Sequence, residues 1–131
     1  MTDQSKRAKA NKRKGAAFEI DLESFFSGLL LKVMRLVRRG KDDEGDVLLR
    51  AADVAFVIEA KNEKAMNLSG YMAEAKAEAL NCESRHVHDP DAPALVIGVA
   101  AVKRRMQPIS KTYIVMEADD FAALCLHLQA R

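Results

Sequence analysis

The chain has 131 residues, of which 49% are hydrophobic and 31% charged, so it fits one globular domain with one sizeable core. No apolar run approaches the roughly 20 residues of a membrane span, and the polar N-terminus does not resemble a signal peptide. Two cysteines, Cys82 and Cys125, argue against a disulfide framework and favour a reducing cytoplasm.

The net charge of +2 conceals an uneven distribution. Residues 1–14 contain six basic side chains and one acid, which leaves 15 of the 21 basic and 18 of the 19 acidic side chains for the remainder. Because residues 1–14 have no apolar periodicity, we expect a basic flexible arm there and a single domain over 15–131. Such an arm suits a polyanionic partner, since Lys and Arg release counterions from phosphates. A disordered solubilising tail accounts for the same composition.

The first half of the domain combines one helix with three strands. Phe18, Leu22, Phe25 and Leu29 recur at helical spacing, which predicts an amphipathic helix over about 16–30. Strands are expected over 33–39 and 47–49, on either side of a charged turn over 41–45. Residues 54–58 are an unbroken apolar run, typical of a strand that is covered on both faces.

The second half repeats the alternation of helix and strand. A helix is expected over about 68–81, with an apolar stripe formed by Leu68, Tyr71, Met72, Ala75 and Ala79. A polar loop over 82–93 precedes strands over 94–102 and 113–116. The last helix should begin near Asp119 and pack through Phe121, Leu124, Cys125 and Leu128. The order α-β-β-β-α-β-β-α predicts an α/β fold, a mixed sheet with helices on its faces.

The segment from Asp46 to Asn62 contains the residues that point to chemistry. Glu59 and Lys61 are two positions apart in a strand and therefore point to the same side. A hairpin-like connection can return Glu59 to the neighbourhood of Asp46, and two carboxylates at a strand end suit Mg²⁺. Lys61 would orient an attacking water or stabilise charge that develops on a phosphate. These are the parts that metal-assisted phosphodiester hydrolysis requires.

This arrangement resembles the PD-(D/E)XK nuclease superfamily: Asp46 matches its first acid, Glu59 its second and Lys61 its lysine. Glu19 matches, in position, a helix glutamate that often completes the metal site of that superfamily. The stretch from Lys14 to Glu19, KGAAFE, is similar to the entry into the first helix of archaeal-type and phage Holliday junction resolvases. The resemblance covers about residues 12–102.

The resemblance carries expectations about fold, cofactor and partners. It implies a restriction-endonuclease-like fold and a metal site of Asp46, Glu59 and Glu19 that holds Mg²⁺, with Mn²⁺ able to substitute. It also implies a homodimer that cuts branched DNA in the cytoplasm of a bacterial, archaeal or phage-infected cell. The chain departs from the pattern at Gly45, where the superfamily has proline, and at residues 42–44, three further acids in the same turn.

Several basic side chains are candidates for contact with a DNA backbone, although each has an alternative as a solvated surface charge. One of them, Lys76, lies at the edge of the second helix's apolar stripe, where the superfamily tends to carry a polar residue that faces the site. The full set is Lys12, Arg13, Lys14, Arg35, Arg38, Arg39, Lys41, Lys76, Arg104 and Arg105.

Other functions stay open at the level of sequence. Another nuclease on the same scaffold, with nicking, mismatch or restriction-like activity, shares the same motif, because substrate choice resides in loops and dimer geometry. A catalytically inactive DNA-binding protein is the alternative from a different class. A zinc site at Cys82, His86, His88 and Asp89 is disfavoured, because the spacing matches no compact zinc module.

Overall fold

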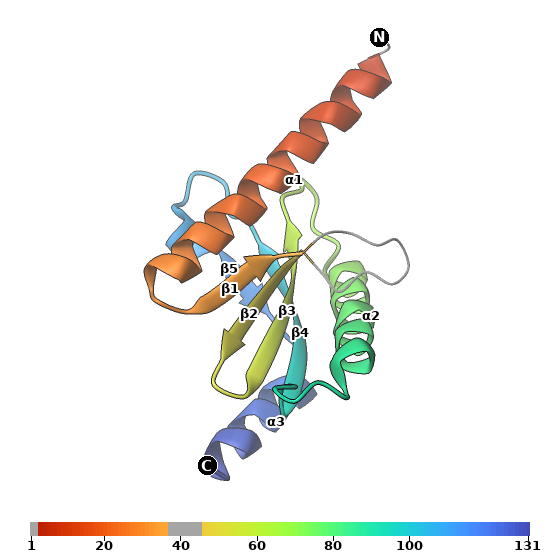
Figure 1. Cartoon of the computed structure of the whole chain (residues 1–131). Helices are drawn as coiled ribbons and strands as arrows, with labels where there is room; N and C mark the ends of the chain where they lie inside the picture. The colour runs from red at the N-terminus through yellow and green to blue at the C-terminus, as the bar shows by residue number, and fades with distance from the viewer. Residues whose placement is uncertain (1–2, 37–45) are drawn as a thin grey trace.

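The computed structural model describes residues 3–36 and 46–131, with the side chains of residues 7–8 and 10–14 left out. Its elements in chain order are α1 (Asp3–Gly28), β1 (Lys32–Arg35), β2 (Val47–Ala51), β3 (Val54–Lys61), α2 (Leu68–His86), β4 (Leu95–Val102), the 3-10 turn η2 (Ile109–Lys111), β5 (Tyr113–Val115) and α3 (Ala118–Gln129) (Figure 1). No helix within these residues is long and apolar enough to cross a membrane.

The described strands form one five-stranded sheet in the order β1-β2-β3-β4-β5. β3 and β4 are parallel, and the other neighbours are antiparallel. A parallel pair needs a long crossover connection, which α2 provides between β3 and β4. The predicted α/β class, a mixed sheet flanked by helices, is confirmed.

The two faces of the sheet are covered by different helices. Val54 and Ile58 of β3 belong to the core cluster that includes Phe18 of α1, whereas Val57 packs with Ala79 of α2. Alternate residues of a strand point to opposite faces, so Glu59 and Lys61 share the α2 face with Val57. In Figure 1, α1 and α2 accordingly lie on different sides of the sheet. Burial on both faces explains the unbroken apolar run that predicted this strand.

A glycine determines how closely α2 approaches the sheet. A Cβ placed on Gly98 of β4 would lie 2.7 Å from the carbonyl carbon of Ala75 and would clash with its oxygen. Ala75 and Ala79, which lie along this contact, have small side chains and are buried. The missing side chain of Gly98 therefore allows the backbone of α2 to lie directly against β4.

Two helices differ from the sequence-based expectation. α1 begins at Asp3, within the segment predicted to be a flexible arm, and its first turns extend beyond the sheet (Figure 1). It ends at Gly28, so Leu29, expected in its apolar stripe, lies beyond it and is 59% exposed. α2 continues to His86, so the start of the predicted polar loop is helical, and Leu68 is exposed.

α3 packs less completely than its amphipathic pattern predicts. Leu124 contacts the α1-side core, but Phe121 is 57% and Leu128 55% exposed, and Cys125 is also exposed. The neighbouring strand β5 has only three residues, so the described part of the chain offers little surface to cover this helix. The prediction that all four residues pack inward was therefore wrong for three of them.

Candidate active site

Asp46 is held at the junction of three strands. Its backbone N–H donates to the carbonyl of Ile58 (3.0 Å), and its own carbonyl accepts from the N–H of Leu36 (3.0 Å). Its Oδ2 accepts a hydrogen bond of 2.8 Å from the N–H of Ala60, and the residue is only 1% exposed. Both its backbone and its carboxylate are therefore fixed relative to β3, next to Glu59.

Glu59 and Lys61 lie at the carboxyl end of β3 and interact directly, on the shared side that strand alternation predicts. Lys61 Nζ is 3.1 Å from Glu59 Oε1, with side-chain exposures of 14% and 5%. Lys61 also lies 5.3 Å from the ring centroid of Tyr71, whose hydroxyl donates to Glu63 in the connection to α2. The lysine is thus held between the sheet and α2.

Helix α2 adds two carboxylates that the sequence analysis did not identify. One oxygen each of Glu59, Glu74 and Glu78 lie within 4.8 Å of one another. Glu78 is 8% exposed, whereas the Glu74 side chain is 52% exposed and its Oε2 accepts a hydrogen bond of 2.8 Å from Lys61. A signal for Glu78 was present in the sequence, because it lies one turn beyond Ala75, on the buried side of the helix.

Lys76, the residue of α2 chosen from the sequence, contacts a different part of the molecule. Its Nζ binds Asp120 Oδ2 at 2.8 Å and Glu117 Oε1 at 3.0 Å. These hydrogen bonds raise the pKa of Lys76 and connect α2 to the start of α3. The printed contacts of Lys76 are thus with α3, and its expected role at the site stays a prediction.

Burial and charge perturb the groups of the site. Burial raises the pKa of Glu59 and the charge of Asp46 raises it further, while a hydrogen bond from Glu78 and the proximity of Lys61 oppose the increase. For Lys61, burial lowers the pKa, but the bond to Glu74 and the charge of Glu59 outweigh burial, so its pKa is raised. Lys61 is consequently a permanent ammonium group at neutral pH and supplies positive charge rather than a base.

Glu19 occupies a separate environment. It is 9% exposed, and its Oε1 lies 3.8 Å from Nε of Arg35 in β1. Its helix, α1, packs on the face of the sheet opposite α2. Among the described residues, neither Glu19 nor Asp46 belongs to a group of three acidic ligands as compact as that of Glu59, Glu74 and Glu78. The expected role of Glu19 in metal binding stays a prediction.

A cavity of about 500 Å³ opens beyond the carboxyl ends of β3 and β4. The Lys103 N–H donates to the carbonyl of Lys61 (3.0 Å), so the end of β4 lies beside the acidic site. Three basic residues line the cavity, Lys64, Lys103 and Arg105, together with Asn62, Glu63 and Met106. This arrangement gathers positive charge next to Lys61.

The other candidates for DNA contact differ in what surrounds them. The Arg104 guanidinium lies 4.3 Å from the ring centroid of Tyr113 and contributes to packing there. Arg35 is engaged with Glu19. The side chains of Lys12, Arg13 and Lys14 are not described, and Arg38, Arg39 and Lys41, with the predicted turn over 41–45, lie outside the described residues.

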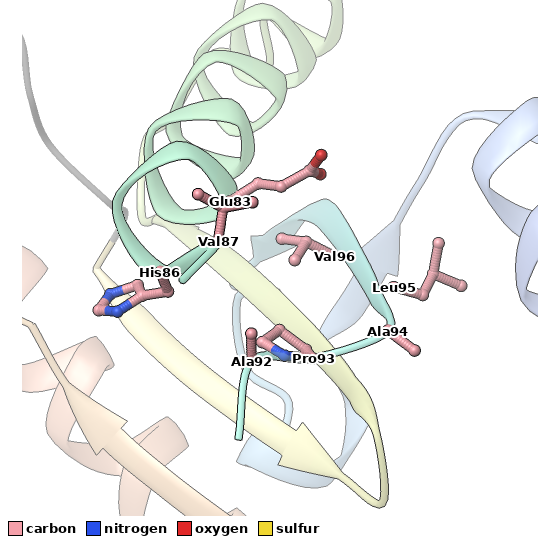
Figure 2. A pocket seen from close by; sticks show the side chains of 8 residues that line it. All are labelled: Glu83, His86, Val87, Ala92, Pro93, Ala94, Leu95 and Val96. Atoms are coloured by element: carbon pink, nitrogen blue, oxygen red, sulfur yellow. The ribbon is translucent and has the colours of Figure 1, made fainter. Parts of the chain in front are cut away.

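A second cavity, of about 330 Å³, lies at the opposite end of β4 from the acidic site. Figure 2 shows its lining from Glu83 and His86 in the last turn of α2, from Val87 just after the helix, and from residues 92–96. His86 Nδ1 pairs with Asp89 Oδ2 at 2.7 Å, and no group of three potential metal ligands occurs here among the described residues. These contacts give no support to a zinc site.

Comparison with protein-family models finds no match to this chain, and comparison with curated protein sequences finds no relative.

Proposed function

We propose that this protein is a Mg²⁺-dependent endodeoxyribonuclease with a restriction-endonuclease-like fold, selective for four-way or other branched DNA. One observation carries the proposal: buried Glu59 lies at the end of β3 beside the ammonium of Lys61, and buried Asp46, at the head of β2, accepts a hydrogen bond from the neighbouring Ala60 N–H. Buried carboxylates are unfavourable unless they are paired or bind metal, and burial raises the pKa of Glu59 even beside the ammonium of Lys61. A divalent cation would stabilise the ionised form of this carboxylate.

The residues present fit such a cation. Glu59 Oε2 is buried and has no hydrogen-bond partner among the described residues, so it is an acceptor that a cation would satisfy. The surrounding donors are carboxylate oxygens, which Mg²⁺ and Mn²⁺ prefer. Asp46 and Glu59 are therefore the ligands we assign first.

The chain's own residues account for the remaining requirements of phosphodiester hydrolysis. Asp46 and Glu59 would hold the Mg²⁺, which would supply polarisation of the phosphate and a lowered pKa of a water. Asp46 is held by the Ala60 N–H, which keeps its carboxylate in place without rearrangement. Lys61, with its raised pKa, stabilises the negative charge that develops on the phosphate, and it orients the attacking water through its N–H donors.

Positive charge near the site supports a nucleic-acid substrate. Lys103 and Arg105 line the cavity beyond β3 and β4, and Lys6 and Lys9 are exposed on the projecting part of α1. Such groups fix a backbone by its phosphates and carry no base specificity. A four-way junction has two-fold symmetry, which favours a homodimer, and the exposed apolar side chains of α3 favour association.

The deciding experiment is cleavage of a synthetic four-way junction, with linear, nicked and flap DNA as controls, in Mg²⁺ and in EDTA. Wild type is compared with Asp46→Asn and Glu59→Gln, and with Glu83→Gln, which changes an exposed glutamate of α2 that lines the cavity at the start of β4. We expect paired nicks in the junction that disappear in EDTA and in the first two variants but persist in the third.

Two other results would change the conclusion. Metal-dependent cutting of the control DNAs in preference to the junction would keep the active site but assign it to another nuclease class. Tight DNA binding without cutting in Mg²⁺ or Mn²⁺, unchanged by Asp46→Asn, would replace the enzyme with a DNA-binding protein.

A further inference from the structure

We propose that helix α2 completes the metal site, with Glu78 as a cation ligand beside Glu59 and Glu74 at the exposed rim. This inference rests on the proposed function for the identity of the cation. It departs from the expectation by resemblance, in which Glu19 of α1 provides the additional carboxylate.

The spacing of the three carboxylates suits a divalent cation. One oxygen from each of Glu59, Glu74 and Glu78 lies within 4.8 Å of the other two. Octahedral Mg²⁺ with oxygen ligands at about 2.1 Å separates adjacent ligand oxygens by about 3 Å and opposite ones by about 4 Å. Small rotations of the side chains are enough to reach these distances.

A second observation, independent of the spacing of the carboxylates, also indicates a cation beside Glu59. Glu59 is 4% exposed, its Oε1 pairs with Lys61, and its Oε2 receives no hydrogen bond from any described residue. A buried acceptor without a donor is unfavourable, and the hydrogen bond that Glu78 makes to Glu59 leaves this oxygen unsatisfied. A metal ion between these groups satisfies the Glu59 oxygen and offsets their mutual repulsion.

The fold positions Glu78 rigidly. Ala75 packs against Gly98 of β4 without an intervening side chain, and Glu78 follows Ala75 by three residues on the same side of the helix. Its side chain is only 8% exposed, and one of its carboxylate oxygens lies within 4.8 Å of an oxygen of Glu59. A preformed ligand loses little conformational freedom when the cation binds.

Glu19 is placed less favourably for this role. It is also buried, but Nε of Arg35 lies 3.8 Å from its Oε1, so a cation would have to compete with an arginine. Glu19 and Glu78 therefore form a matched pair of buried glutamates on opposite faces of the sheet. Glutamine at each position therefore tests whether Glu19 or Glu78 is the additional metal ligand.

The test is titration of the full-length protein with MgCl₂ and MnCl₂ by calorimetry in the absence of DNA, with the metal-induced shift of the melting temperature as a second readout. We expect Glu59→Gln and Glu78→Gln to weaken metal binding by at least tenfold, since even indirect partners of a metal ligand contribute 10–100-fold. Glu19→Gln and Glu83→Gln should bind within about twofold of wild type. Glu74→Gln should show an intermediate loss because its side chain is half exposed.

A folding defect would not obscure the result. Gln at position 78 keeps the size of the side chain, and its amide can still donate a hydrogen bond to Glu59, so the metal-free variant should melt close to wild type in EDTA. Glu78→Asp provides a second variant, which keeps the charge but withdraws the carboxylate by one methylene, and it should also weaken metal binding. Normal binding in both Glu78 variants, loss of binding in Glu19→Gln alone, or no binding by wild type would each overturn the inference.

The outcome is separable from that of the proposed function. Metal binding that depends on Glu78, without cleavage of any DNA, would leave the metal site standing and remove the nuclease. Metal-dependent cleavage with wild-type metal affinity in Glu78→Gln would leave the nuclease standing and remove Glu78 from its site.

Discussion

Glu59 and Lys61, two residues apart on β3, form an ion pair of 3.1 Å between Oε1 and Nζ that is almost wholly removed from solvent. The same lysine reaches Glu74 of α2 at 2.8 Å, so one ammonium group connects the acid of the sheet with an acid of the helix. Lys61 therefore places a positive charge in the site and also joins β3 to α2.

We predict that Lys61→Met lowers kcat by about 10²–10³-fold, as expected when one preorganised group that stabilises the transition state is removed. KM should change little if Lys61 acts on the developing charge rather than on bound DNA. Steady-state kinetics on the cleaved DNA substrate gives both parameters. The control is Lys64→Met, an exposed lysine three residues further on. An equal loss in both variants would show that general positive charge, and not the position of Lys61, matters.

The contact between α2 and β4 gives a second prediction. Gly98→Ala places a Cβ against the backbone of Ala75, which cannot move as a flexible side chain can, so we expect a loss of stability of about 1–3 kcal/mol. The variant should also bind metal more weakly, because α2 positions Glu74 and Glu78. Gly15→Ala is the matched control: among the described residues, nothing outside its own stretch of helix lies within 4 Å of the added Cβ, and alanine in a helix should stabilise by about 0.5–1 kcal/mol. Urea denaturation measures the free energy of unfolding of both variants. Wild-type stability in Gly98→Ala would contradict the close approach.

The local part of the site could be predicted from the sequence. Asp46, Glu59 and Lys61 belong to one antiparallel pair of strands joined by a tight turn, so alternation and register place them together. These three residues lie close together because of the backbone geometry of one continuous segment, so their proximity could be predicted without knowing how distant parts of the chain pack.

The contribution of α2 could not be derived in this way. Lys76 and Glu78 both lie close to the apolar stripe of that helix; helical spacing puts Glu78 on the buried side with Ala75, but its proximity to Glu59 depends on how α2 packs on the sheet at Gly98. The helical start of α1 was missed for a different reason. Apolar periodicity detects a helix that packs, whereas residues 3–14 are rich in Lys, Arg and Ala, which form helices through intrinsic propensity.

The cavity beside Lys61 gives a prediction about DNA affinity. If Lys103 and Arg105 contact phosphates, alanine at either position should weaken binding similarly for all sequences and reduce the salt slope, d log K/d log[salt], by about 0.9. Arg104→Ala is the informative control, because Arg104 stacks on Tyr113 and should affect stability rather than the salt slope. Binding to labelled junctions at several salt concentrations measures the slope, in the background of Asp46→Asn, which the proposed function predicts to be inactive. Unchanged slopes in Lys103→Ala and Arg105→Ala would exclude this surface from the DNA path.

The turn between β2 and β3 is attached to α3 by a contact that should respond to pH. A hydrogen bond of 2.8 Å between His127 Nε2 and Asp53 Oδ1 lowers the pKa of Asp53 below its ordinary 3.8. A lowered pKa means that the folded state favours the ionised carboxylate, so the stabilisation is present above pH 3.8 and is lost as the pH falls through the folded-state pKa. Asp53→Asn should therefore melt below wild type at neutral pH, and the difference should shrink as the pH falls below 3.8. Thermal melts from pH 7 downward, with the exposed Asp21→Asn as control, test this. A difference that persists unchanged at low pH would mean that the contact does not depend on the charge of Asp53.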